Sequence, residues 1–325
     1  MPVSFFERYF SRRVWIRQQQ SKFSSCLSHK VNDFLVRVAW TVSPVETLIV
    51  FKPDLSTLVP FALSKANLNQ DTLTTFRVID RSEKSPSITV WNLSNDEFDR
   101  AGSIPFAEDA RVFQARGALF IYYQVAVHRE DGSLDCDIFI FDPVKSITTQ
   151  VFSPFSFNGK NWVPYEYEGC LHFIYSIEPL VVLRTKSWTD EVLLLEVAFK
   201  EKAFSLNEFA WGDRLGIFGS IRGGSQLLPI GNDKFLGFTH LTPPGVLKFS
   251  HQAGVLFYNA KTFTIEHKNL TSLKPGLLLD PFGICLNGDI VEMSYSFSVN
   301  NPHELESVVG SSVAVFSFER LCKLF

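Results

Sequence analysis

A short pattern occurs four times along this chain: a turn that contains glycine, followed at once by a strand rich in aromatic residues. The clearest copy is residues 168–177, EGCLHFIYSI. Leu171, Phe173 and Tyr175 alternate there with His172, Ile174 and Ser176. Alternation with a period of two predicts a β-strand. The other copies lie in residues 116–127, 231–241 and 287–299.

The spacing of these copies limits the possible folds. Their glycines, Gly117, Gly169, Gly231 and Gly288, recur roughly every 50–60 residues, at or slightly above the period of propeller blades. Each blade is a four-stranded sheet, and further strand-like segments lie between the copies. With the strands expected in residues 35–93, the pattern predicts five blades. A pair of β-sandwiches is the alternative, because periodicity alone does not close a ring.

We therefore predict an all-β chain: a five-bladed β-propeller over residues 36–325 with a short helical extension over residues 1–35. The segments at 34–42 and 46–52 are expected to form a first pair of strands. Residues 54–75 have no clear period, and we expect a loop with a helical turn there.

Composition excludes several classes of function. The 325 residues carry a net charge of −3, so there is no basic surface typical of a nucleic-acid-binding protein. The five cysteines have no CxxC spacing, which indicates neither a disulfide framework nor a zinc site. We predict no metal, no cofactor and a cytoplasmic location. The basic, aromatic helix expected at the N-terminus is a candidate for contact with a membrane surface.

Several segments, in matching order between about residues 85 and 302, carry a family resemblance. They are Glu108-Asp109-Ala110-Arg111-Val112-Phe113, Lys160-Asn161-Trp162-Val163-Pro164 with the strand after it, Arg222-Gly223-Gly224-Ser225, Gly237-Phe238-Thr239-His240, and Ser294-Tyr295 through Asn300-Asn301. Together they resemble the motifs of glycoside hydrolase family 130, which contains five-bladed β-mannoside phosphorylases and hydrolases, and of related β-mannosyltransferases.

The resemblance implies a carbohydrate-active enzyme and indicates which residues would form its site. Asp109 matches the position of the family's catalytic acid. The residues that match sugar-binding or phosphate-binding positions, or that we assign to such contacts by their chemistry, are Arg111, Lys160, Asn161, Trp162, Arg222, His240 and Asn301.

The chemistry of these residue types agrees with those roles, and each has a structural alternative. An inverting glycosidase needs a carboxylic acid that protonates the departing oxygen, and a neighbour such as Glu108 can raise the pKa of Asp109. Arginine and lysine bind phosphate. Asp109 could instead cap backbone amides in a turn, and the cations could form ion pairs between blades. Trp162 could stack on a pyranose ring or pack between blades.

The chain also departs from the family pattern. Leu180 stands where relatives often have histidine, and Asn301 where they often have aspartate. Gly159 and Ala110 replace a glutamate and a proline. The loss of two candidate phosphate or sugar contacts argues against a phosphorylase and leaves three alternatives: a glycosyltransferase that uses an activated sugar or a sugar phosphate, a hydrolase, and a propeller that has lost catalysis. For hydrolysis, the candidates for a second carboxylate are Glu166, Glu168 and Glu178. Asp135, Asp137 and Asp142 have the spacing of a solvated strand face.

The predicted function is therefore transfer or cleavage of β-mannosyl or similar units with inversion, with Asp109 as general acid or base. The expected partners are a mannoside or a sugar phosphate, with inorganic phosphate as a further candidate. The alternative is a non-catalytic propeller that binds a glycan or a protein.

Overall fold

The computed structural model of the protein describes ten stretches of the chain. These are residues 40–54, 58–80, 88–95, 99–129, 134–156, 158–201, 220–242, 250–272, 277–299 and 308–325. The chain divides into two units, Met1–Trp40 and Thr41–Phe325, and the second unit contains all the strands described below. The helix predicted for residues 1–35 lies outside the described residues.

The strands of the second unit form five antiparallel groups. The first group is β2 (Leu58–Leu68), β3 (Asp71–Asp80), β4 (Ile88–Ser94) and β5 (Asp99–Pro105). The second is β6 (Glu108–Ala115), β7 (Ala118–His128), β8 (Leu134–Asp142) and β9 (Ile147–Phe152). The third is β10 (Val163–Tyr167), β11 (Cys170–Ser176), β12 (Val181–Trp188) and β13 (Val192–Lys200).

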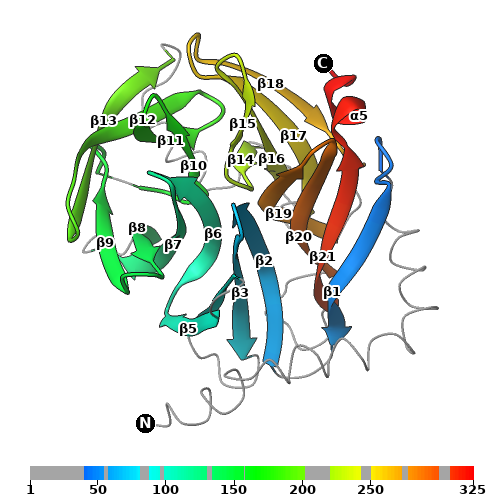
Figure 1. Cartoon of the computed structure of the whole chain (residues 1–325), viewed down its shortest axis with the longest axis horizontal. Coiled ribbons are helices and arrows are strands. Elements are labelled where there is room, and N and C mark those ends of the chain that lie inside the picture. The colour runs from blue at the N-terminus through cyan, green and yellow to red at the C-terminus, as the bar shows by residue number, and fades with distance from the viewer. Residues whose placement is uncertain are drawn as a thin grey trace. The chain divides into compact units, whose positions relative to one another are not determined.

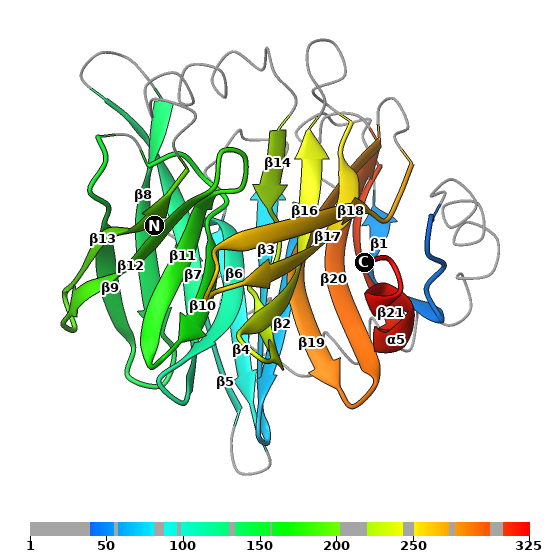
Figure 2. The ribbon, with the colours of Figure 1, turned by 90° about the horizontal axis from the view of Figure 1, so that it is seen from above.

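The last two groups depart slightly from this plan. In the fourth, the first strand is interrupted: β14 (Ser220–Gly223) and β15 (Leu228–Gly231) pair with β16 (Lys234–Thr242), which is followed by β17 (Gln252–Asn259) and β18 (Thr264–Asn269). The fifth contains β19 (Leu277–Asn287), β20 (Ile290–Val299), β21 (Val308–Ser317) and β1 (Glu46–Asp54). A short helix, α5 (Phe318–Cys322), follows β21 (Figure 2).

The five groups close into a ring. β1 pairs with β21, so strands from near the two ends of the chain share one blade. β2 lies against β19, β20 and β21 of the fifth blade on one side and against β6 of the second blade on the other. Figure 1 shows the blades following one another around a centre. The second unit is therefore a five-bladed β-propeller, which confirms the predicted fold. The expected partner of β1, residues 34–42, lies almost entirely outside the described residues.

The hydrophobic core lies between neighbouring blades. One cluster joins the first and second blades through Trp91, Val112 and Ile121, and a second joins the second and third through Phe120, Trp162 and Phe173. A third cluster joins the third and fourth blades, and a smaller one joins the fifth to the first. Aromatic strands suit this arrangement because both faces of a blade are covered by its neighbours.

The repeated glycine turns each join the first and second strands of a blade. Gly117, Gly169 and Gly288 have positive φ angles of 70°, 72° and 59°, which glycine adopts without strain. The first blade makes the same turn at Asn69, with φ of 54° and no glycine. The loop predicted for residues 54–75 is therefore wrong: β2 and β3 begin there, and the turn signal was an asparagine.

Strand direction decides where polar residues meet. Because the strands of a blade alternate in direction, the starts of all first strands lie at one end of the ring, together with the ends of the second strands. Any motif that immediately precedes a first strand is brought to this end.

No helix among the described residues is long and apolar enough to cross a membrane.

Candidate functional site

The predicted site residues gather at that end of the ring. Asp109 is the second residue of β6, and Lys160, Asn161 and Trp162 immediately precede β10. Arg222, in β14, is the register partner of His240, near the end of β16. Three separate motifs of the second, third and fourth blades thus meet. Asn301 lies outside the described residues.

Arg111 connects these motifs and is itself almost fully buried, with 1% of its surface exposed. Its Nη1 donates to the carbonyl oxygen of Asp109 at 2.9 Å, and its Nη2 donates to Oδ1 of Asn161 at 2.8 Å. It also donates to the carbonyl oxygens of Gly223 and Gly224. Burial lowers the pKa of Arg111, while nearby groups including Asp109 and Asp280 raise it. The guanidinium therefore uses its N–H groups to bind protein oxygens of these motifs, and is not free to bind an anion through two parallel hydrogen bonds.

The glycines of the Arg222-Gly223-Gly224 motif allow this close packing. A Cβ at Gly223 would collide with the main-chain oxygen of Asn161. A Cβ at Gly224 would lie 2.8 Å from the carbonyl oxygen of Phe238 and 2.9 Å from that of Pro281. The two positions bring the third, fourth and fifth blades into main-chain contact, which only a residue without a side chain permits.

The carboxylate of Asp109 is held by two side chains that the motifs did not predict. Nη1 of Arg77, on β3, lies 3.2 Å from Oδ1, and Nε2 of Gln124, on β7, donates to Oδ2 at 3.3 Å. The backbone of Asp109 has a positive φ of 47°, a conformation that non-glycine residues rarely adopt and that occurs often at functional sites. The side chain remains 17% exposed.

Glu108 forms a pair of carboxylates with Asp109 around the same arginine. Its Oε1 lies 2.7 Å from Nη2 of Arg77. Burial raises the pKa of Glu108, and the charge of Asp109 adds to the rise, while Arg77 and Lys160 lower it. Burial is the main cause, so Glu108 retains a proton more readily than an exposed glutamate although it is paired with Arg77.

Gln124 also joins Asp109 to the loop before β10. Its Oε1 accepts from the backbone N–H of Asn161 at 3.4 Å, while its Nε2 reaches Asp109. Gln124 is fully buried, as is the ring of Trp162. Trp162 packs edge-on against Phe173 and near Tyr175, so it has no exposed face for a sugar ring. Its structural alternative, packing between blades, is what the geometry supports.

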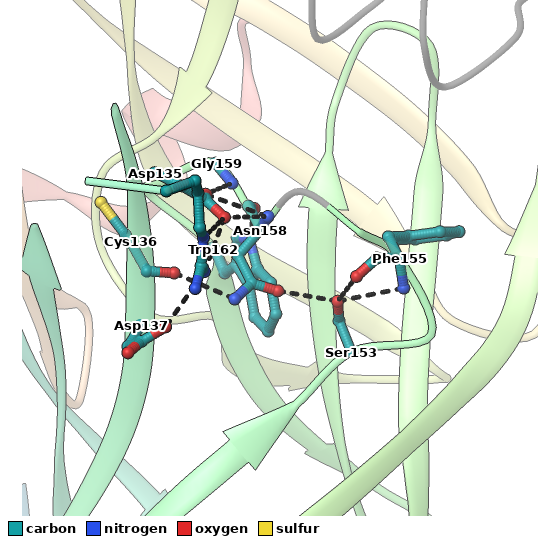
Figure 3. A network of polar contacts seen from close by, with 9 residues as sticks. Asp135, Cys136, Asp137, Ser153, Phe155, Asn158, Gly159 and Trp162 are labelled. Carbon is teal, nitrogen blue, oxygen red and sulfur yellow. Dashed lines mark hydrogen bonds and ion pairs between the residues drawn. The ribbon is translucent and has the colours of Figure 1, made fainter. Parts of the chain in front are cut away.

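Figure 3 shows how the loop before β10 is fixed. Oδ1 of Asp135 accepts from the backbone N–H groups of Asn158 and Gly159, both at 3.1 Å, and its Oδ2 pairs with Arg129 at 2.8 Å. The side-chain amide of Asn158 donates to the carbonyl oxygen of Cys136, and the main-chain carbonyl oxygen of Asn158 accepts from the indole N–H of Trp162. The solvated role predicted for Asp135 is wrong, because its side chain is fully buried.

A second polar cluster at the same end of the ring consists of His240, His251 and Asp280. Nδ1 of His251 lies 2.6 Å from Oδ1 of Asp280, whereas Nδ1 of His240 lies 3.9 Å from it. The two imidazole rings stack, with centroids 4.9 Å apart and planes inclined by 22°. Nδ1 of His240 is buried and has no hydrogen-bond partner among the described residues.

Electrostatics keep the members of this cluster in different charge states. Burial is the main reason that the pKa of His240 lies well below its usual value. The charge of Asp280 raises this pKa, and interactions with His251, Arg222 and Arg111 lower it. Burial by itself would raise the pKa of Asp280, but the interactions with His251, including their hydrogen bond, and the charge of Lys160 hold that pKa below its ordinary value. His240 is therefore neutral and Asp280 ionised near neutral pH.

The three glutamates proposed as a second carboxylate lie elsewhere. Glu166 accepts from the backbone N–H of Arg116, which follows the far end of β6, and Glu168 is exposed in the next turn. Seven residues of extended chain separate Arg116 from Asp109, a distance of about 20 Å. Glu178 lies at the same end as Asp109 but is exposed in the turn after β11. Asp280 was missed; its signal was a carboxylate within the apolar segment LLLDPF.

The comparisons with known proteins agree with this architecture. No protein-family model and no curated protein sequence matches the chain. Among solved structures, a GDP-Man-dependent mannosyltransferase from Leishmania mexicana superposes with a TM-score of 0.57 and 13% identity, over 88% of this chain and 93% of that one. A mannose phosphorylase from the same organism, in complex with a phosphate ion, gives 0.53 and 10%, over 93% and 92%.

A more distant neighbour widens the class. A GH43_1 enzyme from Xanthomonas citri, complexed with xylotriose, superposes with a TM-score of 0.50 and 10% identity, over 82% of this chain and 90% of that one. The chain thus has the propeller fold that these carbohydrate-active enzymes adopt. At 10–13% identity the likeness is one of fold.

Proposed function

We propose that the chain is a carbohydrate-active enzyme that transfers or cleaves β-mannosyl or similar glycosyl units with inversion. Asp109 is the general acid that protonates the departing oxygen, and it accepts the proton in the reverse direction. The observation that carries the proposal is the placement of Asp109. It has an unusual backbone conformation and lies beside Glu108 and Arg77, at the end of the ring where the Lys160, Arg222 and His240 motifs also meet.

The surrounding groups suit an anionic donor. Lys160 is exposed, and its charge lowers the pKa of both Glu108 and Asp280. It therefore acts on the Glu108–Asp109 pair and also on the cluster of His240, His251 and Asp280. Arg222 lowers the pKa of His240. A phosphate or diphosphate group held by these cations would be stabilised as it departs. Asn161 and His240 complete the proposed sugar contacts, with Arg111 and Trp162 supporting them.

The solved structures give two chemistries to choose between. One neighbour is a GDP-Man-dependent transferase and the other a mannose phosphorylase with bound phosphate. A glycosyl unit leaving from GDP would release GDP, whereas one leaving from a sugar phosphate would release inorganic phosphate.

The test is an assay with GDP-mannose and mannose 1-phosphate as donors against a panel of sugar acceptors. Wild type and Asp109→Asn are compared, with GDP and phosphate release followed separately. We expect turnover with one donor, reduced at least about 100-fold by the substitution, which is the usual contribution of a general acid or base. Equal turnover in the two proteins would refute the role of Asp109.

A non-catalytic glycan-binding propeller is the second candidate. It is favoured by one observation: both carboxylate oxygens of Asp109 already have partners, Arg77 and Gln124. Saturable binding of a mannoside to folded protein, without turnover of either donor, would support this function instead.

A further inference from the structure

The pair formed by Asp280 and His251 has the geometry of a proton acceptor. A carboxylate that binds Nδ1–H of a histidine fixes the tautomer in which Nε2 is the basic nitrogen, and stabilises the imidazolium that forms. The 2.6 Å contact between Nδ1 and Oδ1 places the proton on Nδ1, because the carboxylate of Asp280 is ionised. Nε2 of His251 has no hydrogen-bond partner among the described residues. It is also not one of the fully buried polar atoms that lack a partner.

His240 is suited to support this pair. Its ring stacks on that of His251, but its Nδ1 is 3.9 Å from the carboxylate, beyond hydrogen-bond reach. Burial keeps His240 uncharged, so a proton that arrives at His251 meets one neutral ring and one carboxylate rather than a second positive charge.

The pair lies in the same polar neighbourhood as Asp109. Arg111 binds the carbonyl oxygen of Asp109, and both Asp109 and Asp280 act on the pKa of this buried arginine. Arg111 also binds the Gly224 carbonyl, and Gly224 lies against the main chain of Pro281, which follows Asp280. The two carboxylates therefore flank one buried cation at the same end of the ring, each on the first strand of its blade.

The same three side chains could be considered as ligands for a divalent metal, since their donor atoms lie within 4.8 Å of one another. A metal must lie close to the plane of each imidazole that binds it. Two stacked rings inclined by only 22° do not point their nitrogen lone pairs at one atom. The short contact between Asp280 and His251 is already a complete hydrogen bond.

We propose that His251, oriented by Asp280, is the general base that takes the proton from the hydroxyl group attacking the glycosyl donor. The O–H bond of a sugar acceptor or of water breaks, and its proton moves to Nε2 of His251. The oxygen bonds to the anomeric carbon as the bond to the leaving group breaks, and the leaving group departs with the electron pair. Asp109 protonates the leaving oxygen where it needs a proton.

This inference rests on the proposed function and makes it more specific. Phosphate as nucleophile needs no base, whereas a hydroxyl does. The pair therefore favours a hydroxyl group, of a sugar or of water, as the acceptor of the glycosyl unit. It also supplies the second proton-transfer group that the glutamates predicted from sequence do not.

The experiment uses α-mannosyl fluoride with a panel of sugar acceptors, because this donor has the anomeric configuration of GDP-mannose and fluoride leaves without a proton, so its release depends on the proton acceptor. Fluoride release by the whole protein is measured for wild type, His251→Gln, Asp280→Asn and His172→Gln. We expect His251→Gln and Asp280→Asn to lose at least about 100-fold in kcat with little change in KM, and His172→Gln to remain within 10-fold of wild type. Imidazole is expected to restore part of the rate of His251→Ala.

His172→Gln is the matched control, because His172 is also a buried histidine with a stacked ring, and its one hydrogen-bond partner within the described part of the chain is the carbonyl oxygen of Cys170. Release by His251→Gln within 10-fold of wild type would overturn the inference and leave the proposed function standing. Wild-type activity lost with a chelator and restored by a divalent metal would overturn it in favour of a metal site. No turnover of any donor by wild type would overturn both proposals.

Discussion

Arg111 donates hydrogen bonds to oxygen atoms from three parts of the chain while remaining almost fully buried. Its position in a motif suggested contact with a phosphate, but its partners are the main chain of Asp109, the side chain of Asn161 and two glycine carbonyls. Its guanidinium carbon also lies 5.5 Å from the centre of the Phe282 ring. The planar guanidinium of arginine can donate several hydrogen bonds in fixed directions at once, and the ammonium group of lysine cannot reproduce that arrangement.

We therefore expect Arg111→Lys to destabilise the fold by about 3 kcal/mol, since several buried acceptors lose their donors. Chemical denaturation measures the free energy of unfolding. Arg184→Lys is the control, because Arg184 is more than half exposed and pairs with Glu196; it should change stability by less than about 1 kcal/mol. Equal effects of the two substitutions would contradict the structural role of Arg111.

His267 gives a prediction for the dependence of stability on pH. Burial lowers its pKa to about 4, and its Nε2 lies 2.8 Å from the hydroxyl of Thr239. A histidine whose pKa is lower in the folded than in the unfolded state stabilises the fold above pH 6.5, and that contribution is lost as the pH falls from 6.5 towards 4.

The free energy of unfolding of wild type should therefore fall by about 2 kcal/mol more than that of His267→Gln over this range, a value discounted for partial exposure. Denaturation series at pH 7 and pH 4 provide the comparison. Parallel losses in the two proteins would show that His267 is not held neutral by the fold.

At the scale of elements, the loop before β10 depends on one buried carboxylate. Asp135 receives two backbone N–H groups of the loop and the guanidinium of Arg129. The loop carries Lys160 and Asn161, and Asn161 has a positive φ of 68° that the contacts around it must maintain. The element is therefore held in place by a side chain from the neighbouring blade (Figure 3).

Asp135→Asn should destabilise the protein by about 2 kcal/mol, because an amide replaces a buried carboxylate that accepts charge-assisted bonds. It should also raise KM more than it lowers kcat if Lys160 and Asn161 contact the donor. Asp137→Asn is the matched control, since Asp137 is more exposed and has one contact with Arg129. A KM for Asp135→Asn equal to that of the control would separate the loop from donor binding.

The sequence predicted elements well where a local signal matched the structure. Glycine turns located the first two strands of four blades, and aromatic alternation located β7, β11, β16 and β20. The first blade was missed at residues 54–75, where Asn69 rather than a glycine makes the turn and β2 contains a proline, Pro60. Long-range partners could not be predicted: Arg77, Gln124, His251 and Asp280 belong to no motif, and only the closed ring brings them to the site.

At the scale of the whole molecule, closure of the ring brings the residues of the candidate site together. β1 completes the blade that begins with β19, and β2 packs between the last blade and the second. Asp109, the loop before β10, Arg222 and Asp280 all lie near the starts of first strands, so four blades contribute to one end of the propeller. The proposed inverting reaction needs a proton donor and a proton acceptor from different blades, which this arrangement provides.

The most direct test is a proton NMR time course of the products that wild type and Asp109→Asn form from α-configured GDP-mannose or mannose 1-phosphate with a sugar acceptor. We predict that the first product of wild type has the β configuration, because a single displacement inverts the anomeric centre. We predict no product above background for Asp109→Asn. An α-linked first product would contradict the proposed inversion, and equal rates for the two proteins would contradict the catalytic role of Asp109.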